Sequence, residues 1–208
     1  MRHRNRGRKL GRNPSHQRAL LRSLASALIL TERDPKESEP NKPKVKGRII
    51  TTLQKAKEVR PLVERCVTIA RRVLVHQKTA EGLAASAPRH SDKWLAWRRS
   101  AQWLEWNQAV APVVAARRRV LRLLGNKQAV RILFDKLADR FADRDGGYTR
   151  VLHLAKPRLG DAAPRAVLEF VGTRDRQRKK APKPAIEPEA APEPAQSDAP
   201  ETPETPSS

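Results

Sequence analysis

The charged residues of this chain are segregated along its length, and this segregation limits what the chain can fold into. Residues 1–22 contain eight Lys or Arg residues and no acid, whereas residues 181–208 contain eight prolines, six acids and a single base, Lys183. A tail of Ala, Pro and Glu cannot bury enough apolar surface to fold. Because the tail carries −5 of the net charge of +22, residues 1–180 carry +27. The part that folds must therefore withstand strong self-repulsion, which favours a polyanionic partner.

A cationic excess of this size makes nucleic acid the first candidate ligand and an anionic membrane surface the second. The length of 208 residues fits one compact domain with appendages, and no apolar run is long enough to span a bilayer. Cys66 is the only cysteine, which excludes an intrachain disulfide and a cysteine-based zinc cluster and fits a reducing cytosol. Its apolar neighbours at helical spacing favour core packing over a reactive thiol.

Residues 1–12 form a predicted basic arm with two glycines, no acid and almost nothing to bury. We expect this arm to be disordered alone in water and to become ordered when it neutralises the phosphates of folded RNA. Arginine predominates, which suits bidentate phosphate contacts and stacking on bases. The candidate RNA-binding residues of the arm are Arg2, His3, Arg4, Arg6, Arg8, Lys9 and Arg12.

A helix is predicted over residues 14–30, with Asn13 as its cap and a proline at its first position. Its apolar residues lie on one face, which favours a folded helix over a targeting peptide. A helix start attracts phosphate through its free N–H groups. The further candidates here are Ser15, His16, Arg18 and Arg22. A simple capping role is an equal alternative for Ser15, whereas RNA contact is favoured over metal binding for both His16 and His3 because no acid or cysteine is near.

Hydrophobic periodicity and turn residues predict the other elements. They are a strand at 48–52, a helix at 53–74, a tryptophan-containing helix at 93–115, a helix at 126–141, and strands at 148–154 and 166–171. The last two strands should pair as an antiparallel hairpin with a long loop. Pro61 is expected to kink or divide its helix. Residues 33–47 and 76–92 are a predicted loop and linker.

The four tryptophans lie close together, at positions 94, 97, 103 and 106. On a single helix they would form two nearly opposite apolar faces, so that helix should pack between two surfaces. One hypothesis is that one face packs on the core and the other meets a neighbouring protein or rRNA. The alternative is an internal helical hairpin with the preceding or following helix.

A second basic region surrounds the loop between the last two strands. Arg150, Lys156 and Arg158 are the candidates for phosphate contacts in this region. For Tyr148, core packing is favoured over stacking on a base, because one aromatic residue is weak evidence for stacking.

The sequence favours no enzymatic activity. It contains no Walker-type loop, no HExxH motif and no spaced Cys/His set. Asp143 and Asp145 precede two glycines, and two acids on a turn are more often a helix end than a metal site. We therefore expect no catalytic residue, no cofactor, no metal and no small-molecule substrate.

Four blocks of the sequence carry a family resemblance. The string MRHRNRGRKLGRNPSHQRALLRSL closely resembles the start of the bacterial large-subunit ribosomal protein seventeen family. Three further blocks match in the same order, at Thr51–Arg60, Phe141–Arg150 and Gly160–Phe170, and Lys156 and Arg158 precede the last block as in the family. Four ordered blocks are far more specific than one short motif.

This resemblance implies an α+β fold, with a small mixed three-stranded sheet covered by helices in the order α-β-α-α-α-β-β. It also implies a non-enzymatic constituent of the cytoplasmic large ribosomal subunit that binds large-subunit rRNA near the peptide exit, beside other ribosomal proteins. We expect residues 1–12 to form the arm and 13–172 the core domain. Residues 33–47 and 73–115 look inserted relative to the family. The tail at 173–208 lies beyond it.

Two other functions stay open at this point. The stretch RQRKKAPKPA at Arg176–Ala185 is similar to the tail of a basic protein that compacts nucleic acid outside the ribosome, which would bind DNA without sequence preference. Co-sedimentation distinguishes the two, because a compacting protein follows DNA. The chain could also be an interaction module that works through its tryptophan helix, which deletion of residues 76–115 would test.

Overall fold

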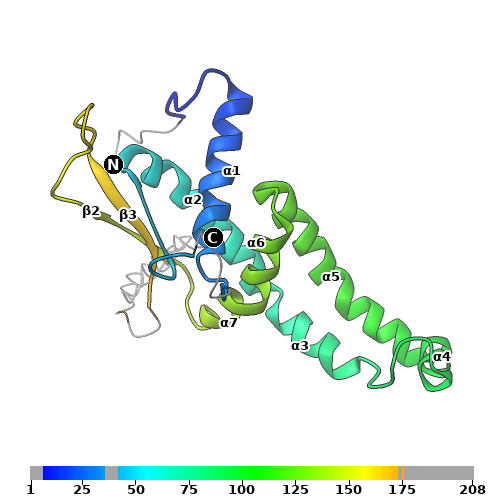
Figure 1. Cartoon of the computed structure of the whole chain (residues 1–208). Helices are drawn as coiled ribbons and strands as arrows, with labels where there is room; N and C mark the ends of the chain where they lie inside the picture. Colours follow the sequence, from blue (N-terminus) through cyan, green and yellow to red (C-terminus); the bar gives the residue numbers. More distant parts are fainter. Residues whose placement is uncertain (1–6, 36–41, 173–174, 176–208) are drawn as a thin grey trace, which may run out of the picture. The chain divides into compact units, whose positions relative to one another are not determined.

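The computed structural model describes residues 7–35, 42–172 and 175. This part of the chain contains helices, one π-helical segment and the strands of one sheet (Figure 1). The elements are α1 (Pro14–Leu30), β1 (Arg48–Thr52), α2 (Leu53–Arg72), α3 (Leu74–Leu83), α4 (Asp92–Arg99), α5 (Ala101–Leu124), α6 (Lys127–Ile132), η1 (Leu133–Leu137), α7 (Ala138–Arg140), β2 (Thr149–His153) and β3 (Arg165–Phe170). The disorder expected of residues 1–6 and of 176–208 concerns residues outside those described.

The three strands form one sheet in the order β1-β3-β2. β3 pairs antiparallel with both neighbours, placing Ile50 opposite Val167 and Val151 opposite Leu168. The α+β class and the β2–β3 hairpin are therefore confirmed, but the sheet is antiparallel throughout and the prediction of a mixed sheet was wrong. β1 and β2 do run in the same direction, yet they form no parallel pair because β3 lies between them.

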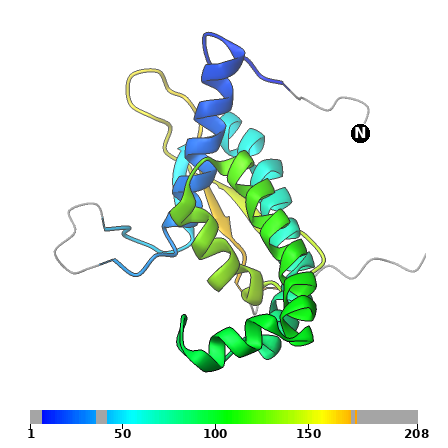
Figure 2. The same ribbon diagram turned by 90° about the vertical axis from the view of Figure 1, so that its right-hand side faces the viewer.

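The helices lie on one side of the sheet (Figures 1 and 2). α2 is central, since it packs against α1, α5, β2 and β3. Its buried side is made by side chains spaced three or four residues apart, which is one face of a helix. They are Ala56, Val59, Val63, Cys66, Val67 and Ala70. Cys66 is 0% exposed, so the prediction that it packs in the core is confirmed.

Two predicted helix starts have the expected side-chain caps. The Asn13 carboxamide oxygen accepts the N–H of His16 at 2.7 Å, and α1 begins at Pro14 as predicted. The Asn126 carboxamide oxygen accepts the N–H of Ala129 at 3.0 Å. Each bond satisfies a backbone donor that a helix start would otherwise leave unpaired.

The helix predicted at 126–141 is a continuous helical segment made of α6, η1 and α7. The apolar face that its spacing predicted is buried, as are Phe134 and Phe141 within it. The π-helical turn of η1 was not predicted, because a single π turn leaves no clear trace in a hydrophobic pattern. Tyr148 is 0% exposed and lies 5.2 Å from the Phe141 ring, which confirms its packing in the core.

The predicted linker at 76–92 and the division at Pro61 were wrong. α2 continues through the exposed Pro61 and is interrupted at Val73, after which α3 occupies most of the first half of that linker. Leu74 and Ala80 of α3 are each 6% exposed, and α3 packs along α5. Tertiary packing on a neighbouring helix thus stabilises a short helix in which half of the residues are polar.

The prediction that the four tryptophans share one helix was wrong. The chain breaks at Ser100, which is extended with φ −84° and ψ 165°, so two tryptophans belong to α4 and two to α5. α3, α4 and α5 (residues 74–124) together form what we call the tryptophan hairpin, in which α3 lies along α5 and α4 contacts α5 (Figure 1). Of the two arrangements that the sequence left open, the structure therefore has the internal helical hairpin.

Candidate nucleic-acid interface

The inner half of the predicted arm lies against the first two helices. The N–H of Gly7 donates to the Glu58 carboxylate of α2 at 3.2 Å. The Gln17 amide of α1 donates to the carbonyl oxygen of Arg8 at 2.7 Å. Lys9 and its neighbours therefore emerge close to the starts of α1 and α2. Four candidates of the arm lie outside the described residues, namely Arg2, His3, Arg4 and Arg6.

His16 has a structural role that the sequence did not predict. Its Nδ1 accepts the backbone N–H of Arg12 at 3.3 Å, so the neutral ring carries its proton on Nε2. A Cβ atom at Gly11 would lie 2.5 Å from that Nδ1, which explains the glycine there. Ser15 is the second residue of α1 and does not cap it, since Asn13 does. The imidazole thus shapes the arm and keeps one N–H donor for an anion.

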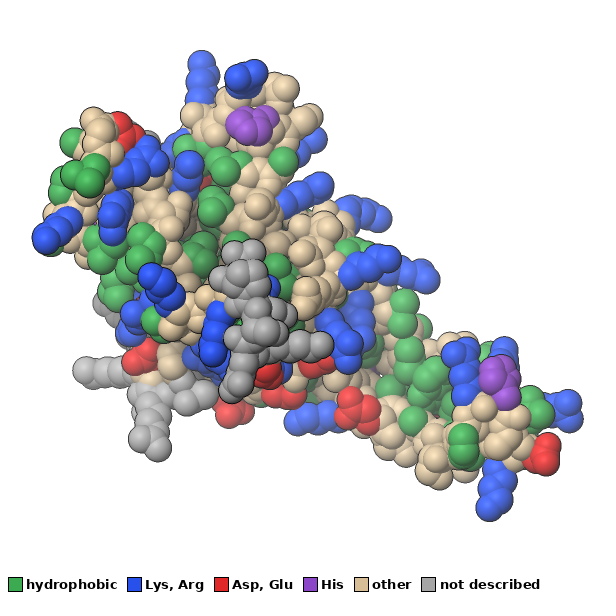
Figure 3. Space-filling view, in the orientation of Figure 1, with side chains coloured by type: hydrophobic (Ala, Val, Ile, Leu, Met, Phe, Trp, Pro, Cys, Tyr) green, Lys and Arg blue, Asp and Glu red, His purple; other side chains and the backbone are tan. Residues whose placement is uncertain are grey.

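The cations of α1 lie on its exposed side. Ser15, Arg18 and Arg22 follow one another at spacings of three and four residues, share one helix face and are all exposed. Leu28 and Ile29, which are 0% exposed, anchor the end of the same helix in the core. Figure 3 shows basic side chains around the start of α1. The predicted ligands Arg8 and Arg12 belong to the segment that enters this helix.

Arg150 has two acidic partners inside the protein. Its Nε lies 2.5 Å from the Glu169 carboxylate, and its Nη1 lies 3.2 Å from Asp175. The side-chain hydrogen bond to Glu169 raises the pKa of the Arg150 guanidinium. Any phosphate at Arg150 would have to share it with these carboxylates, so its role as an RNA ligand stays a prediction.

The loop between β2 and β3 carries the other two candidates. Lys156 is exposed, and Arg158 donates through Nε to Asp161 at 2.9 Å. That hydrogen bond lowers the pKa of the Asp161 carboxyl to about 2. Both side chains of the pair are about half exposed. The pair shapes the loop and leaves part of the guanidinium accessible.

A cleft of about 390 Å³ joins this loop to the start of α2. We call it the threonine cleft. It is lined by Ile50, Thr51, Thr52, Lys55, Arg158 and Arg165. The Arg165 Nε is buried and has no hydrogen-bond partner in the described part of the chain. Thr52 stands at the cap position of α2 without a capping side-chain bond. A helix start, hydroxyls and cations in one cleft suit a phosphate.

Of the residues lining this cleft, sequence reasoning assigned only Arg158 to RNA. Thr51 and Thr52 were assigned to the predicted strand at 48–52, and Lys55 and Arg165 were not assigned to RNA. The signal that could have found Lys55 is a helix start with a Lys at its third position. Lys55 lies one turn before Glu58, to which the arm is bonded, so the arm and the cleft meet at the start of α2.

Other kinds of site find little support within the described residues. There, no three His, Cys, Asp or Glu side chains are placed to hold a metal ion together. No helix within the same ranges has both the length and the apolar character needed to cross a membrane.

The fold and the site indicate the class of protein, which is a basic α+β protein with an ordered arm segment and a cleft suited to anionic ligands. Residues 20–171 match the family model described as Ribosomal protein L17. The chain is 56% identical over 190 residues to the large ribosomal subunit protein bL17 of Rhodopirellula baltica, covering 91% of this chain and 90% of that one. This chain belongs to the ribosomal protein L17 family, which confirms the resemblance.

More distant relatives carry the same name. The bL17 protein of Nitratidesulfovibrio vulgaris is 36% identical over 173 residues, which are 83% of this chain and 90% of the relative. That of Allorhizobium ampelinum is 35% identical over 171 residues, 82% of each chain. The family is a structural component of ribosomes, so the expectation of a non-enzymatic protein is confirmed by family membership.

Proposed function

We propose that this protein is a structural constituent of the large ribosomal subunit that binds and stabilises large-subunit rRNA in the cytoplasm and so supports translation. The observation that carries the proposal is the convergence of cations from separate segments at the starts of α1 and α2. The arm reaches Glu58 of α2, and the threonine cleft begins one turn away at Lys55. Membership of the L17 family supports the ribosomal assignment.

Binding would occur in two parts that use different chemistry. The arm and the exposed face of α1, with Arg18 and Arg22, neutralise backbone phosphates and release condensed counterions. The threonine cleft receives a single phosphate, held by Lys55, Arg165 and the threonine hydroxyls, at the start of α2, where the Leu53 N–H already donates to the Pro164 carbonyl oxygen. Folded rRNA that reaches both parts fixes the orientation of the protein on the subunit, as phosphate contacts generally do.

The partners of this protein would be the rRNA and, as the resemblance implies, neighbouring ribosomal proteins near the peptide exit. The alternative of a protein that compacts nucleic acid outside the ribosome makes a different prediction. It would bind duplex DNA as tightly as rRNA and would leave the large subunit during sedimentation in moderate salt.

The test is binding of the full-length protein to naked large-subunit rRNA at several salt concentrations. We expect Arg18→Ala/Arg22→Ala to weaken binding and to reduce the slope of log affinity against log salt by about 0.7 to 0.9 for each lost contact. The variant Lys55→Ala should reduce the slope by one such step. Arg118→Ala/Arg119→Ala is the matched control, because both residues are exposed on α5 and the loss of charge is the same.

The proposal fails if the α1 variant and the α5 control weaken binding equally, since that would indicate non-specific attraction by net charge. It also fails if duplex DNA competes as well as rRNA does. Circular dichroism of each variant checks that the substitution leaves the fold intact.

A further inference from the structure

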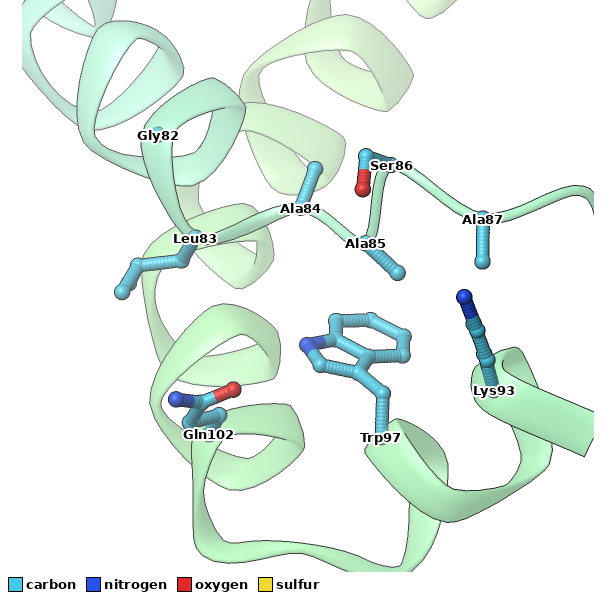
Figure 4. Close-up of a pocket in the computed structure, with 9 residues that line it drawn as sticks. All are labelled: Gly82, Leu83, Ala84, Ala85, Ser86, Ala87, Lys93, Trp97 and Gln102. Carbon is cyan, nitrogen blue, oxygen red and sulfur yellow. The ribbon is translucent and has the colours of Figure 1, made fainter.

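A second candidate site lies in the tryptophan hairpin, far along the sequence from the arm. A pocket of about 330 Å³ opens where the connection from α3 to α4 passes the start of α5. Figure 4 shows the Trp97 indole facing the backbone of residues 83–87, with Lys93 at one side and Gln102 at the other. A volume of this size lies within the range of small-ligand sites in proteins.

The wall formed by Trp97 is held in place by its surroundings. The Trp106 ring meets it nearly edge to face, with centroids 5.5 Å apart and planes at 70°. The Ser100 hydroxyl donates to the Trp97 carbonyl oxygen at 2.7 Å, which fixes the break between α4 and α5. The Trp94 ring has other neighbours: the His90 ring, whose centroid lies 5.4 Å away, and the guanidinium of Arg98. Trp97 is thus positioned in advance as a flat apolar wall.

The charge around this wall is positive. No acidic side chain lines the pocket, whereas Lys93 does. Residues 84–107 contain four Lys or Arg residues and two acids, Asp92 and Glu105. Arg98 lies over the Trp94 ring at 5.2 Å, and Arg99 is exposed beside it. An anionic ligand with a flat aromatic part would therefore find complementary groups.

We propose that this pocket binds an unpaired nucleotide of RNA, with the base stacked on Trp97 and a phosphate beside Lys93. Stacking on aromatic side chains is the general way in which proteins hold splayed-out bases. Gln102 offers both a donor and an acceptor to the edge of a base. A nucleotide is favoured over a protein side chain because the pocket joins an aromatic wall, an amide and a cation. This contact is additional to the one at the starts of α1 and α2.

The position of the tryptophans allows a selective test. All four lie between residues 94 and 106, and none lies in the arm, α1 or the lining of the threonine cleft. Quenching of tryptophan fluorescence by a short single-stranded RNA, such as a hexanucleotide, therefore reports on the hairpin alone. We expect saturable quenching by the single strand and at least about fivefold weaker binding of a duplex of the same length, whose bases are already stacked.

The variant Trp97→Leu should bind the hexanucleotide at least about fivefold more weakly, because stacking of one base contributes about 1 to 3 kcal/mol. Trp103→Leu is the matched control, since Trp103 is also half-buried but does not line the pocket. Lys93→Ala is a second variant at an exposed position, which should keep the fold even if Trp97→Leu does not. It should lower the slope of log affinity against log salt by about 0.7. The variant Arg18→Ala/Arg22→Ala should leave quenching unchanged, which separates this proposal from the proposed rRNA contact.

The proposal is overturned if Trp97→Leu and Lys93→Ala both bind the hexanucleotide as tightly as the wild type does. So would equal quenching by single-stranded and duplex RNA. A fluorescence change that depends on protein concentration and not on RNA would instead identify the pocket as a contact between protein molecules, which also overturns it.

Discussion

The guanidinium of Arg150 lies 2.5 Å from the carboxylate of Glu169, a side chain that is only 4% exposed. Arg48 reaches the same carboxylate from the opposite flanking strand at 2.6 Å. Both arginines stand directly opposite Glu169 in the register of the sheet. One buried carboxylate on β3 thus holds both neighbouring strands, and a residue that the sequence assigned to RNA is part of the fold.

This arrangement predicts a non-additive loss of stability. Arg150→Ala or Arg48→Ala alone leaves one partner on Glu169 and should lower the free energy of unfolding by about 1 kcal/mol. The double variant leaves a buried carboxylate without compensation and should lose about 3 kcal/mol or more. Urea denaturation followed by circular dichroism measures each loss. Strict additivity of the two single losses would show that the arginines do not share Glu169.

A second prediction concerns the contact of α2 with the start of β2. The Glu64 carboxylate accepts the N–H and the hydroxyl of Thr149 at 2.9 and 2.7 Å, and the N–H of Tyr148 at 3.2 Å. Glu64→Gln turns one accepting oxygen into a donor, so a backbone N–H loses its partner. We expect a loss of about 1 to 3 kcal/mol in the free energy of unfolding. Glu105→Gln on α5 is the control, and an equal fall in the midpoint of thermal unfolding would contradict this role.

A third prediction concerns Cys66. Burial raises the pKa of its thiol to about 12, and the side chain is 0% exposed. Since the thiolate is the reactive form, we expect the native protein to resist a thiol-specific reagent at pH 8. The same reagent should label one thiol for each chain after denaturation. Rapid labelling of the native protein would mean that α2 opens readily from the core.

A fourth prediction concerns pH. The Asp34 carboxyl has its pKa lowered from 3.8 to about 2, first by the hydrogen bond from Lys136 and then by that from Lys46. A group whose pKa is lower in the folded state stabilises the fold above its unfolded pKa. That contribution should be complete above about pH 4 and lost as the pH falls towards about 2.

The variant Asp34→Asn tests this origin of the acid sensitivity. Its thermal stability should change less between pH 4 and pH 2 than that of the wild type. Asp139→Asn is the control, because Asp139 is exposed and makes no ion pair within the described residues. An identical pH dependence for Asp34→Asn and the wild type would assign the acid sensitivity to other carboxylates.

Much of the fold could be predicted because its signals are local. Asn13 and Pro14 mark the start of α1, and the spacing of Val59, Val63 and Cys66 marks the buried side of α2. The strands and their hairpin follow from β-branched residues and turn residues. By contrast, the break at Ser100 depends on how α4 and α5 pack, which periodicity within a window does not encode.

The candidate site, too, could be predicted only in part from the sequence. The cationic character of the chain's first 22 residues is a matter of composition, and it pointed to a polyanionic partner before any fold was known. Which cations remain accessible was not predictable, because Arg150 is held by Glu169, a residue 19 positions away in sequence. Lys55 and Arg165 come together in one cleft only because β1 and β3 pair.

By itself, the sequence determined the class of this protein, the places where α1, α2 and α6 begin, and the sign of the charge that its partner must have. These properties depend on residue type and on spacing within a few turns of chain. Only the tertiary structure decided the direction of β1 relative to β3, the pairing of each arginine and the pocket beside Trp97. Each of these depends on atoms from segments distant in sequence, whose contacts form only when the core buries its apolar faces.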